Sequence, residues 1–502
     1  MKTVLFFLMS NMALSAQTPV GIFQQTKDVG NPAIKGSTTY DAASQTYHLA
    51  GGGYNIWFER DEFHYAYNKL EGDFILTANF RFAGKGADAH RKIGWMVRAT
   101  EDESAAHISG VLHGDGLTAL QWRNAHGTPM RDPEDERFAP KANYEILRIE
   151  RQGTLITFSA AHPGEPLQTI GVHDFKELPL SVLAGLFICS HHDSVKEMAD
   201  VWNVRISKPK PDDYNAYRQG FIGSRLEVLE VATGMRKVIH ESAGRFEAPN
   251  WMPDGKTLLY NEAGSLWKIP VSGGTPVKLN TGFADRNNND HGISFDGKWL
   301  AISHHVDGKP GGGSTVYVLP LAGGEPRQIT PSTPSYWHGW SADGKDVYYV
   351  AQREGEYYDI YKSSVAGGKE VKLTQNIGFH VDGPEADAKG QFIYYNSSAS
   401  GTMQIWRMKP DGTAAQQLTF DEYNNWFPHI SPDGKWMVYI SFPPTIDVSD
   451  HPFYKRVMLR LQPLDGTAGP RVIAHVYGGQ GTMNVPSWSP DGRYIAFVSN
   501  SR

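Results

Sequence analysis

Histidine, carboxylate and asparagine side chains recur at fixed offsets before six glycines in the second half of this 502-residue chain. The glycines are Gly255, Gly297, Gly344, Gly390, Gly434 and Gly492. Six residues before them, two histidines interrupt a column of prolines: Pro249, His291, His338, Pro384, Pro428 and Pro486. Two residues earlier stand Glu247, Asn289, Tyr336, Asp382, Trp426 and Asn484. One residue after the proline column stand Asn250, Gly292, Gly339, Glu385, His429 and Ser487.

Two kinds of chemistry fit these residues. We predict a catalytic group of His291, His338, Asp382 and Glu385, in which the two carboxylates act as a hydrolytic pair. Imidazoles are also good ligands for divalent ions, so His291, His338 and His429 are the predicted ligands of a manganese, zinc or calcium ion. Substrate is expected to contact the neighbouring polar and aromatic side chains Asn289, Asp290, Trp337, Arg353, Trp426 and Asn484. The alternative is that each histidine only satisfies backbone groups or water.

An internal repeat must position these side chains. Each glycine closes a turn, which is Asp-Gly in five of the six copies, and alternating apolar residues follow it, as in HISPDGKWMVYI. Asp-Gly supplies the positive φ of a tight hairpin turn. Successive glycines are 42, 47, 46, 44 and 58 residues apart. This period is typical of a four-stranded propeller blade.

The two ends of the repeat region complete each other. The last copy ends after two strands, and residues 225–231 and 235–240 read as the two that it lacks. We therefore predict an all-β fold in which residues 224–502 form a six-bladed propeller whose last blade is closed by strands from both ends. Inner strands of a propeller surround one channel, so the candidate site is predicted at the channel mouth. The insertion 442–456 is predicted to be a lid, a partner contact or a surface loop.

The SPDG repeats resemble the C-terminal propeller of the TolB family and related WD40-like (PD40) repeats. Similar propellers serve as periplasmic interaction platforms, as gating domains of prolyl-oligopeptidase-type peptidases, and as the catalytic body of oligogalacturonate lyases. The chain has no Gly-x-Ser-x-Gly motif, which argues against the peptidase. The lyase resemblance implies a histidine-bound metal and a cation for the sugar carboxylate, such as Arg286 or Arg353.

Residues 21–208 form a different unit, with short alternating segments such as DFILTANFRF and KIGWMVRAT separated by turns. This pattern predicts an antiparallel jelly-roll sandwich. It resembles the concanavalin-A-like (laminin-G-like) domains of secreted bacterial glycan-processing proteins. Its aromatic and histidine residues either stack on sugars or lie in the core: Trp57, His64, Tyr65, Trp95 and Trp122. Residues 209–223 are predicted to be a linker.

Composition and the N-terminal residues indicate what kind of partner the protein binds and where it is located. The net charge of −6 has both signs mixed along the chain, which argues against nucleic-acid binding. Beyond the N-terminus there is no apolar run long enough for a membrane span. Lys2, the apolar stretch to Leu14 and the small residues up to Ala16 predict a signal peptide over residues 1–16. A lone Cys189 then fits a bacterial periplasmic or secreted protein.

Two functions remain. The first is an exported carbohydrate-binding or carbohydrate-processing protein, such as a metal-assisted lyase or a hydrolase, that holds an oligosaccharide or cell-envelope glycan at the propeller mouth. The second is a non-catalytic periplasmic scaffold that binds protein partners through the propeller face. A sandwich of glycan-binding type before the propeller favours the first.

Overall fold

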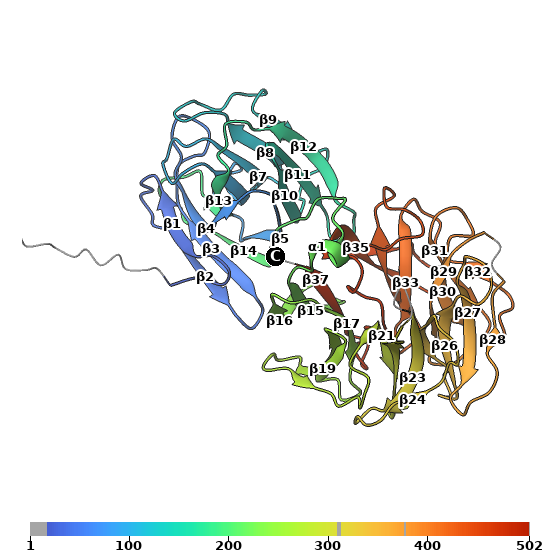
Figure 1. Ribbon diagram of the computed structural model, residues 1–502. Helices are drawn as coiled ribbons and strands as arrows, with labels where there is room; N and C mark the ends of the chain where they lie inside the picture. The colour runs from blue at the N-terminus through green and yellow to red at the C-terminus, as the bar shows by residue number, and fades with distance from the viewer. Residues whose placement is uncertain (1–17, 309–312, 376–377, 501–502) are drawn as a thin grey trace, which may run out of the picture. The chain divides into compact units, whose positions relative to one another are not determined.

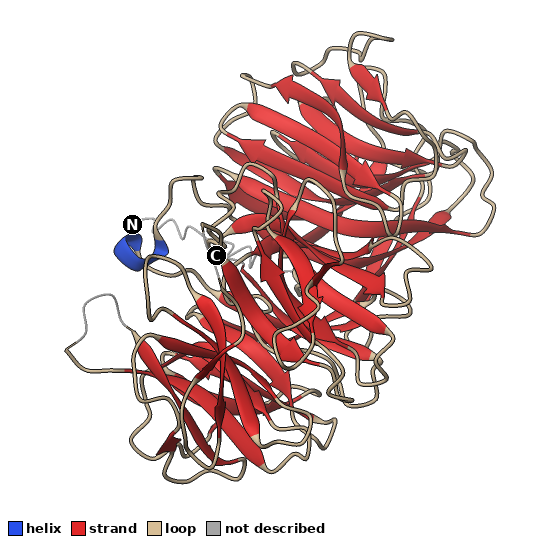
Figure 2. Ribbon diagram, turned by 90° about the vertical axis from the view of Figure 1, so that its right-hand side faces the viewer, coloured by secondary structure: helices blue, strands red, loops and turns tan. Residues whose placement is uncertain are grey.

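The computed structural model describes residues 18–308, 313–375 and 378–500, and their regular structure is almost entirely β-strand (Figures 1 and 2). The predicted signal peptide, residues 1–16, lies outside these ranges. The chain divides into two compact units, of which the first holds residues 1–160 and 168–204 and the second residues 161–167 and 205–502. Within the described ranges, no helix has the length and apolar character needed to cross a membrane.

The first unit contains two seven-stranded sheets. In spatial order, the first sheet consists of β1 (Gln25–Val29), β4 (Phe63–Glu71), β13 (Ser181–Cys189), β6 (Lys92–Arg98), β7 (His107–His113), β8 (Thr118–Arg123) and β9 (Glu136–Phe138). The second consists of β12 (Gln168–Asp174), β11 (Leu155–Ala161), β10 (Ile146–Gln152), β5 (Phe74–Ala83), β14 (Glu197–Ser207), β3 (Thr46–Gly51) and β2 (Ser37–Asp41).

Side chains alternate between the two faces of the first sheet, as the period of a strand requires. Trp95 on β6 is directed at the second sheet, where it packs on Phe80 of β5 and donates to the carbonyl of Leu147 on β10. The predicted sugar-stacking residues Tyr65, Trp95 and Trp122 are buried. The all-β character is confirmed, whereas a concanavalin-like fold for this unit stays a prediction.

The second unit is the six-bladed propeller that the repeat predicts (Figure 1). From the inside outward, blades one to three are β17 (Phe246–Trp251), β18 (Thr257–Glu262), β19 (Ser265–Pro270), β20 (Val277–Lys278); β21 (Asn287–Ile293), β22 (Trp299–His305), β23 (Ser314–Pro320), β24 (Arg327–Gln328); and β25 (Ser335–Trp340), β26 (Asp346–Ala351), β27 (Asp359–Ser364), β28 (Val371–Lys372). Blades four and five are β29 (Val381–Ala386), β30 (Ile393–Ser397), β31 (Gln404–Met408), β32 (Gln416–Gln417); and β33 (Asn424–Ile430), β34 (Trp436–Phe442), β35 (Lys455–Pro463), β36 (Arg471–Gly478).

The sixth blade joins the two ends of the propeller, as predicted. β37 (Tyr494–Asn500) pairs with β15 (Ser224–Glu230), which pairs with β16 (Arg236–Ser242). The buried carboxylate of Glu227 lies between the guanidinium groups of Arg236, at 2.8 Å, and Arg205, at 2.6 Å. Strand pairing and buried charge together therefore close the ring. A single short helix in the described chain, α1 (Ala216–Gln219), precedes β15.

The repeated turn has a clear local cause. In the fifth blade, the hydroxyl of Ser431 donates to Asp433 at 2.7 Å and accepts from the amide of Trp436 at 2.9 Å. Gly434 has φ of 72°, which a residue with a side chain rarely adopts. The Ser-x-Asp-Gly phrase thus fixes the hairpin between the inner and second strands at the end of the blade away from the mouth.

Candidate functional site: the propeller mouth

A cavity of about 710 Å³ lies at the ends where the inner strands of the propeller begin. Every blade contributes one side chain from the same repeat position, two residues before the proline column. These six are Glu247, Asn289, Tyr336, Asp382, Trp426 and Asn484, and all of them line the cavity. Equal offsets in the sequence therefore identified one level of the channel mouth.

Irregularities in the pairing of the inner strands determine which of the residues next to these six also line the cavity. In β21 the pairing with β22 breaks between Asn287 and His291, and in β25 the pairing with β26 breaks between Trp337 and Gly339. An unpaired residue in such a bulge is turned out of the ladder. His338 is the bulge residue of β25 and lines the cavity, whereas His291 is already paired again and does not.

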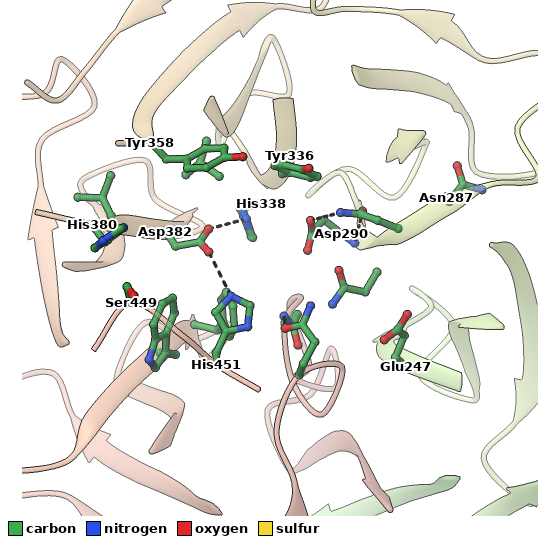
Figure 3. A pocket seen from close by; sticks show the side chains of 18 of the residues that line it. Glu247, Asn287, Asp290, Tyr336, His338, Tyr358, His380, Asp382, Ser449 and His451 are labelled. Carbon is green, nitrogen blue, oxygen red and sulfur yellow. Dashed lines mark hydrogen bonds and ion pairs between the residues drawn. The ribbon is translucent and has the colours of Figure 1, made fainter. Parts of the chain in front are cut away.

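Three ionisable groups lie in a row across the cavity: Asp382, His338 and Asp290 (Figure 3). His338 Nε2 is 2.8 Å from Asp382 Oδ1, and His451 Nε2 is 3.9 Å from Asp382 Oδ2. Asp290 accepts a hydrogen bond of 2.7 Å from Asn288 Nδ2. Tyr336 and Tyr358 flank the row on one side and His451 on the other.

The charges of these groups depend on one another. Burial opposes charge on His338, but the carboxylates of Asp382 and Asp290 outweigh it and raise the His338 pKa. Burial also favours a neutral Asp382, yet the imidazolium of His338 dominates and lowers the Asp382 pKa. Asp290 differs, because burial raises its pKa to about 6, with the His338 charge opposing and the Asp382 charge adding to the rise. Asp290 therefore holds its proton to a higher pH than an ordinary aspartate does, whereas Asp382 loses its proton at a lower pH.

Loops on the same face complete the lining, and sequence reasoning identified only some of these residues. The insertion 442–456 supplies Ser449 and His451, which gives it a place at the mouth. Tyr358 precedes β27. Tyr217 belongs to α1, inside the predicted linker, and has no repeat position that would have revealed it.

Five predicted site residues lie outside the lining of this cavity. Trp337 is fully buried in the core of the third blade. Glu385 bonds to His429 at 2.6 Å and to the amide of Ile430 at 3.1 Å, below the mouth. Arg353 pairs with Glu370 at 2.6 Å, so its charge is already used. His291 and His429 are the remaining two, and both are buried.

The three predicted metal ligands do not form one ligand set. His429 Nδ1 is 2.6 Å from Glu385, and its Nε2 is 3.1 Å from the carbonyl of Met483. His291 Nδ1 is bonded to the carbonyl of Asn289, and His338 is paired with Asp382. Over the described residues, no three His, Cys, Asp or Glu side chains are grouped to hold a metal ion. The donor set therefore does not fit the metal that the lyase resemblance implied.

Comparisons with known proteins agree with the propeller. Residues 339–449 match the family model of the TolB beta propeller domain, PD40. The uncharacterized protein Atu1656 of Agrobacterium fabrum is 44% identical over 280 residues, which are 56% of this chain and 93% of that protein. A solved structure described as putative TolB from Agrobacterium tumefaciens is 43% identical, with a TM-score of 0.53, and the match covers 56% of this chain and 100% of that one.

The uncharacterized peptidase YuxL of Bacillus subtilis is 25% identical over 209 residues, but this chain covers only 28% of that protein. High identity over nearly all of Atu1656, the PD40 match and the six observed blades lead to one assignment. Through its propeller, the chain belongs to the TolB-like β-propeller family.

Proposed function

We propose that the propeller mouth binds the end of an oligosaccharide. The observation that carries this proposal is the set of six side chains, one from each blade, that line a single cavity. Sugars need planar polar groups for their hydroxyls and aromatic faces for their rings. The mouth offers both, with Asn289 and Asn484 near Trp426 and Tyr336. Asn289 Nδ2 is buried with no hydrogen-bond partner among the described residues, so this donor is available to a ligand.

Charge narrows the choice of sugar. Glu247, Asp290 and Asp382 all line the cavity, and Arg245, which lines it too, lies 3.5 Å from Glu247. The two cations predicted to hold a sugar carboxylate are engaged elsewhere, since Arg353 pairs with Glu370 and Arg286 pairs with Asp307 at 2.7 Å. A uronate is therefore a poor fit to this mouth. We expect a neutral or amino sugar.

The unequal carboxyl groups give the mouth a means of hydrolysis. A carboxyl that keeps its proton to about pH 6 can act as a general acid, and a carboxylate that stays ionised can act as a base or nucleophile. Asp290 fits the first role and Asp382 the second. In this proposal Asp290 replaces Glu385, the sequence-based candidate, because Glu385 is bonded to His429 below the cavity.

A second candidate function is the binding of a protein partner. Family membership favours it, and so does an aromatic cluster at the rim. Tyr217 is 73% exposed and contacts Phe221 and Phe453, with Arg245 over the Phe221 ring at 3.9 Å. Aromatic residues and arginine are the residue types enriched at the centres of protein interfaces.

Glycan binding to the purified chain separates the two candidates. A glycan array identifies a ligand, and calorimetry then compares the wild type with Asp382→Asn and with Asp411→Asn. Asp411 is exposed in the turn after β31, outside the cavity, so its variant is a matched loss of one charge. We expect affinity to fall at least tenfold in Asp382→Asn and to stay unchanged in Asp411→Asn. The scaffold function would be supported instead by two results together. The wild type would bind no neutral or amino glycan, and Tyr217→Ala would no longer capture a protein partner that the wild type captures.

Hydrolysis has its own test. Any glycan that binds is incubated with wild type, Asp290→Asn and Asp382→Asn, and the release of reducing ends is measured. Binding without turnover would retain the proposed ligand and remove the proposed catalytic pair.

A further inference from the structure

The first unit holds a buried lysine without a counter-charge. Lys92, at the start of β6, is only 3% exposed. Its Nζ lies 3.0 Å from His191 Nε2, and no carboxylate of the described residues lies within 4.0 Å of it. Buried ammonium groups are normally paired, because removing a charge from water is costly. A missing partner at such a position points to a bound anion.

Two histidines lie beside this ammonium group, and a third lies against both of their rings. His113 is the cross-strand partner of Lys92 on β7, is 4% exposed, and has no hydrogen-bond partner at either ring nitrogen within the described chain. The ring of His90 lies 5.9 Å from that of His113 and 6.1 Å from that of His191. We call Lys92, His90, His113 and His191 the lysine cluster. His90 is exposed and His191 half-buried, so the cluster reaches the surface.

The acidic groups near the lysine cluster do not neutralise it. Asp61, fully buried on the same side of the sheet, is held by Arg98 at 3.1 Å and by Arg123 at 2.6 Å. Glu136 on β9 accepts from Gln121 at 3.1 Å and affects Lys92 only at a longer range than an ion pair. Asp88 acts on Lys92 only through the longer-range field. The thiol of Cys189 is buried, and burial raises its pKa to about 12, so it carries no charge at neutral pH.

We propose that the lysine cluster is a binding site for a small oxyanion, a carboxylate or a sulfate group, held by Lys92 with His113 and His191. An anion would supply the counter-charge that Lys92 lacks and an acceptor for the N–H group of His113. Lys92 Nζ lies 5.9 Å from the centre of the Trp57 ring, so a ring that carries the oxyanion would meet an aromatic neighbour. This site is independent of the propeller mouth and opposite to it in charge.

Proton uptake is a direct consequence. Burial lowers the pKa of Lys92 to about 8, and burial together with the Lys92 charge lowers that of His191 to about 3. A bound anion favours the protonated form of both groups, so binding draws protons from solution. Uptake by Lys92 is expected to be largest above pH 8, where the free amine is mostly neutral.

The experiment compares three sugars of one ring type on the full chain: glucuronate, glucose 6-sulfate and glucose. Calorimetry in buffers of different ionisation enthalpy reports both affinity and protons taken up. We expect the two anions to bind, and Lys92→Met to weaken anion binding at least tenfold while leaving any binding of glucose at the propeller mouth unchanged. Preference between the two anions separates a carboxylate ligand from a sulfate ligand.

Two further variants guard against effects on folding. His113→Asn keeps Lys92 and is expected to weaken binding severalfold. Lys69→Met removes an exposed lysine from β4 of the same sheet and is expected to have no effect. Unchanged anion binding in Lys92→Met, an equal loss of glucose binding in that variant, or an equal loss of anion binding in Lys69→Met would each overturn the proposal.

Discussion

The propeller mouth and the lysine cluster solve the problem of buried charge in opposite ways. At the mouth, the carboxylate of Asp382 has its counter-charge built in, because His338 lies 2.8 Å away. In the lysine cluster, the hydrogen-bond partner of the Lys92 ammonium group is the imidazole of His191, at 3.0 Å. The first arrangement holds its own counter-charge, whereas the anion that we propose would supply that of the second. A site whose charges are balanced within the protein is suited to a neutral ligand. A site with an unbalanced charge is suited to a ligand of the opposite charge.

The two regions also differ in how the chain assembles them. The mouth takes one residue from each of six repeats, and the bulges of the inner strands select which side chain turns inward. The lysine cluster depends on register between neighbouring strands, which places His113 of β7 opposite Lys92 of β6, and on the segment after β13 that carries His191. A site built from repeats can be predicted from the sequence, because its residues recur at one offset. A site built from a single pair of strands leaves no such pattern.

The largest predicted effect comes from the compensated charge of the first unit. Asp61→Asn leaves Arg98 and Arg123 buried without their carboxylate, and losing one partner of a buried ion pair costs about 3–5 kcal/mol. We expect the free energy of unfolding to fall by that amount in urea titrations followed by tryptophan fluorescence. Asp193→Asn, at an exposed position of the same unit, is the control. A loss below about 1 kcal/mol would show that this charge group does not stabilise the unit.

The next effect concerns the mouth. The pKa of Asp290 is about 6 in the folded protein against an ordinary value of 3.8. The folded state therefore binds this proton more tightly than the unfolded state, so stability decreases as pH rises from about 4 to about 6 and stays lower above that. Asp290→Asn removes the penalty and is expected to add about 3 kcal/mol at pH 7, at 1.4 kcal/mol per pKa unit. Denaturant unfolding at pH 4 and pH 7 measures it, and equal stability of both proteins at pH 7 would contradict the raised pKa.

The blades of the propeller could be predicted from the sequence because each repeat contains the residues that determine its own turn and strands. The Ser431-x-Asp433-Gly434 turn is local, so its residues were sufficient to place the hairpin. Even the closure by residues 225–240 followed from counting strands. The signal for the mouth was also local, since a common offset placed Asp382 and Trp426 at one level.

What sequence did not give is the direction of individual side chains. His291 and His338 occupy the same repeat position, yet the break in β21 spans several residues and the break in β25 only one. Arg353 was predicted to be a free cation, but it forms an ion pair with Glu370, seventeen positions away in the sequence. The lysine cluster was missed entirely, because no periodicity connects residues 90, 92, 113 and 191.

A smaller effect tests the pairing at the mouth directly. In the wild type we expect the pKa of His338 above 6.5, since Asp382 and Asp290 favour the imidazolium against burial. Asp382→Asn leaves burial to dominate, so the pKa should fall below that value. NMR titration of the histidine Cε1 protons measures the change, with Asp411→Asn as the variant that should not alter it. An unchanged His338 pKa would mean that the built-in counter-charge is not Asp382.

The smallest predicted loss of stability is that of Lys92→Met. If Lys92 had a structural partner, Lys92→Met would cost several kcal/mol, as in Asp61→Asn. Because Lys92 is buried without a counter-charge, replacing its ammonium group by an apolar side chain of similar length should not lower the free energy of unfolding in the absence of ligand. The same variant should lose any stabilisation that glucuronate gives the wild type, since a ligand stabilises only the state that binds it. A large loss without ligand would assign Lys92 to the folding of the sheet. Unlowered stability together with a lost ligand response would assign Lys92 to binding, because the variant would then lose only the interaction with the anion.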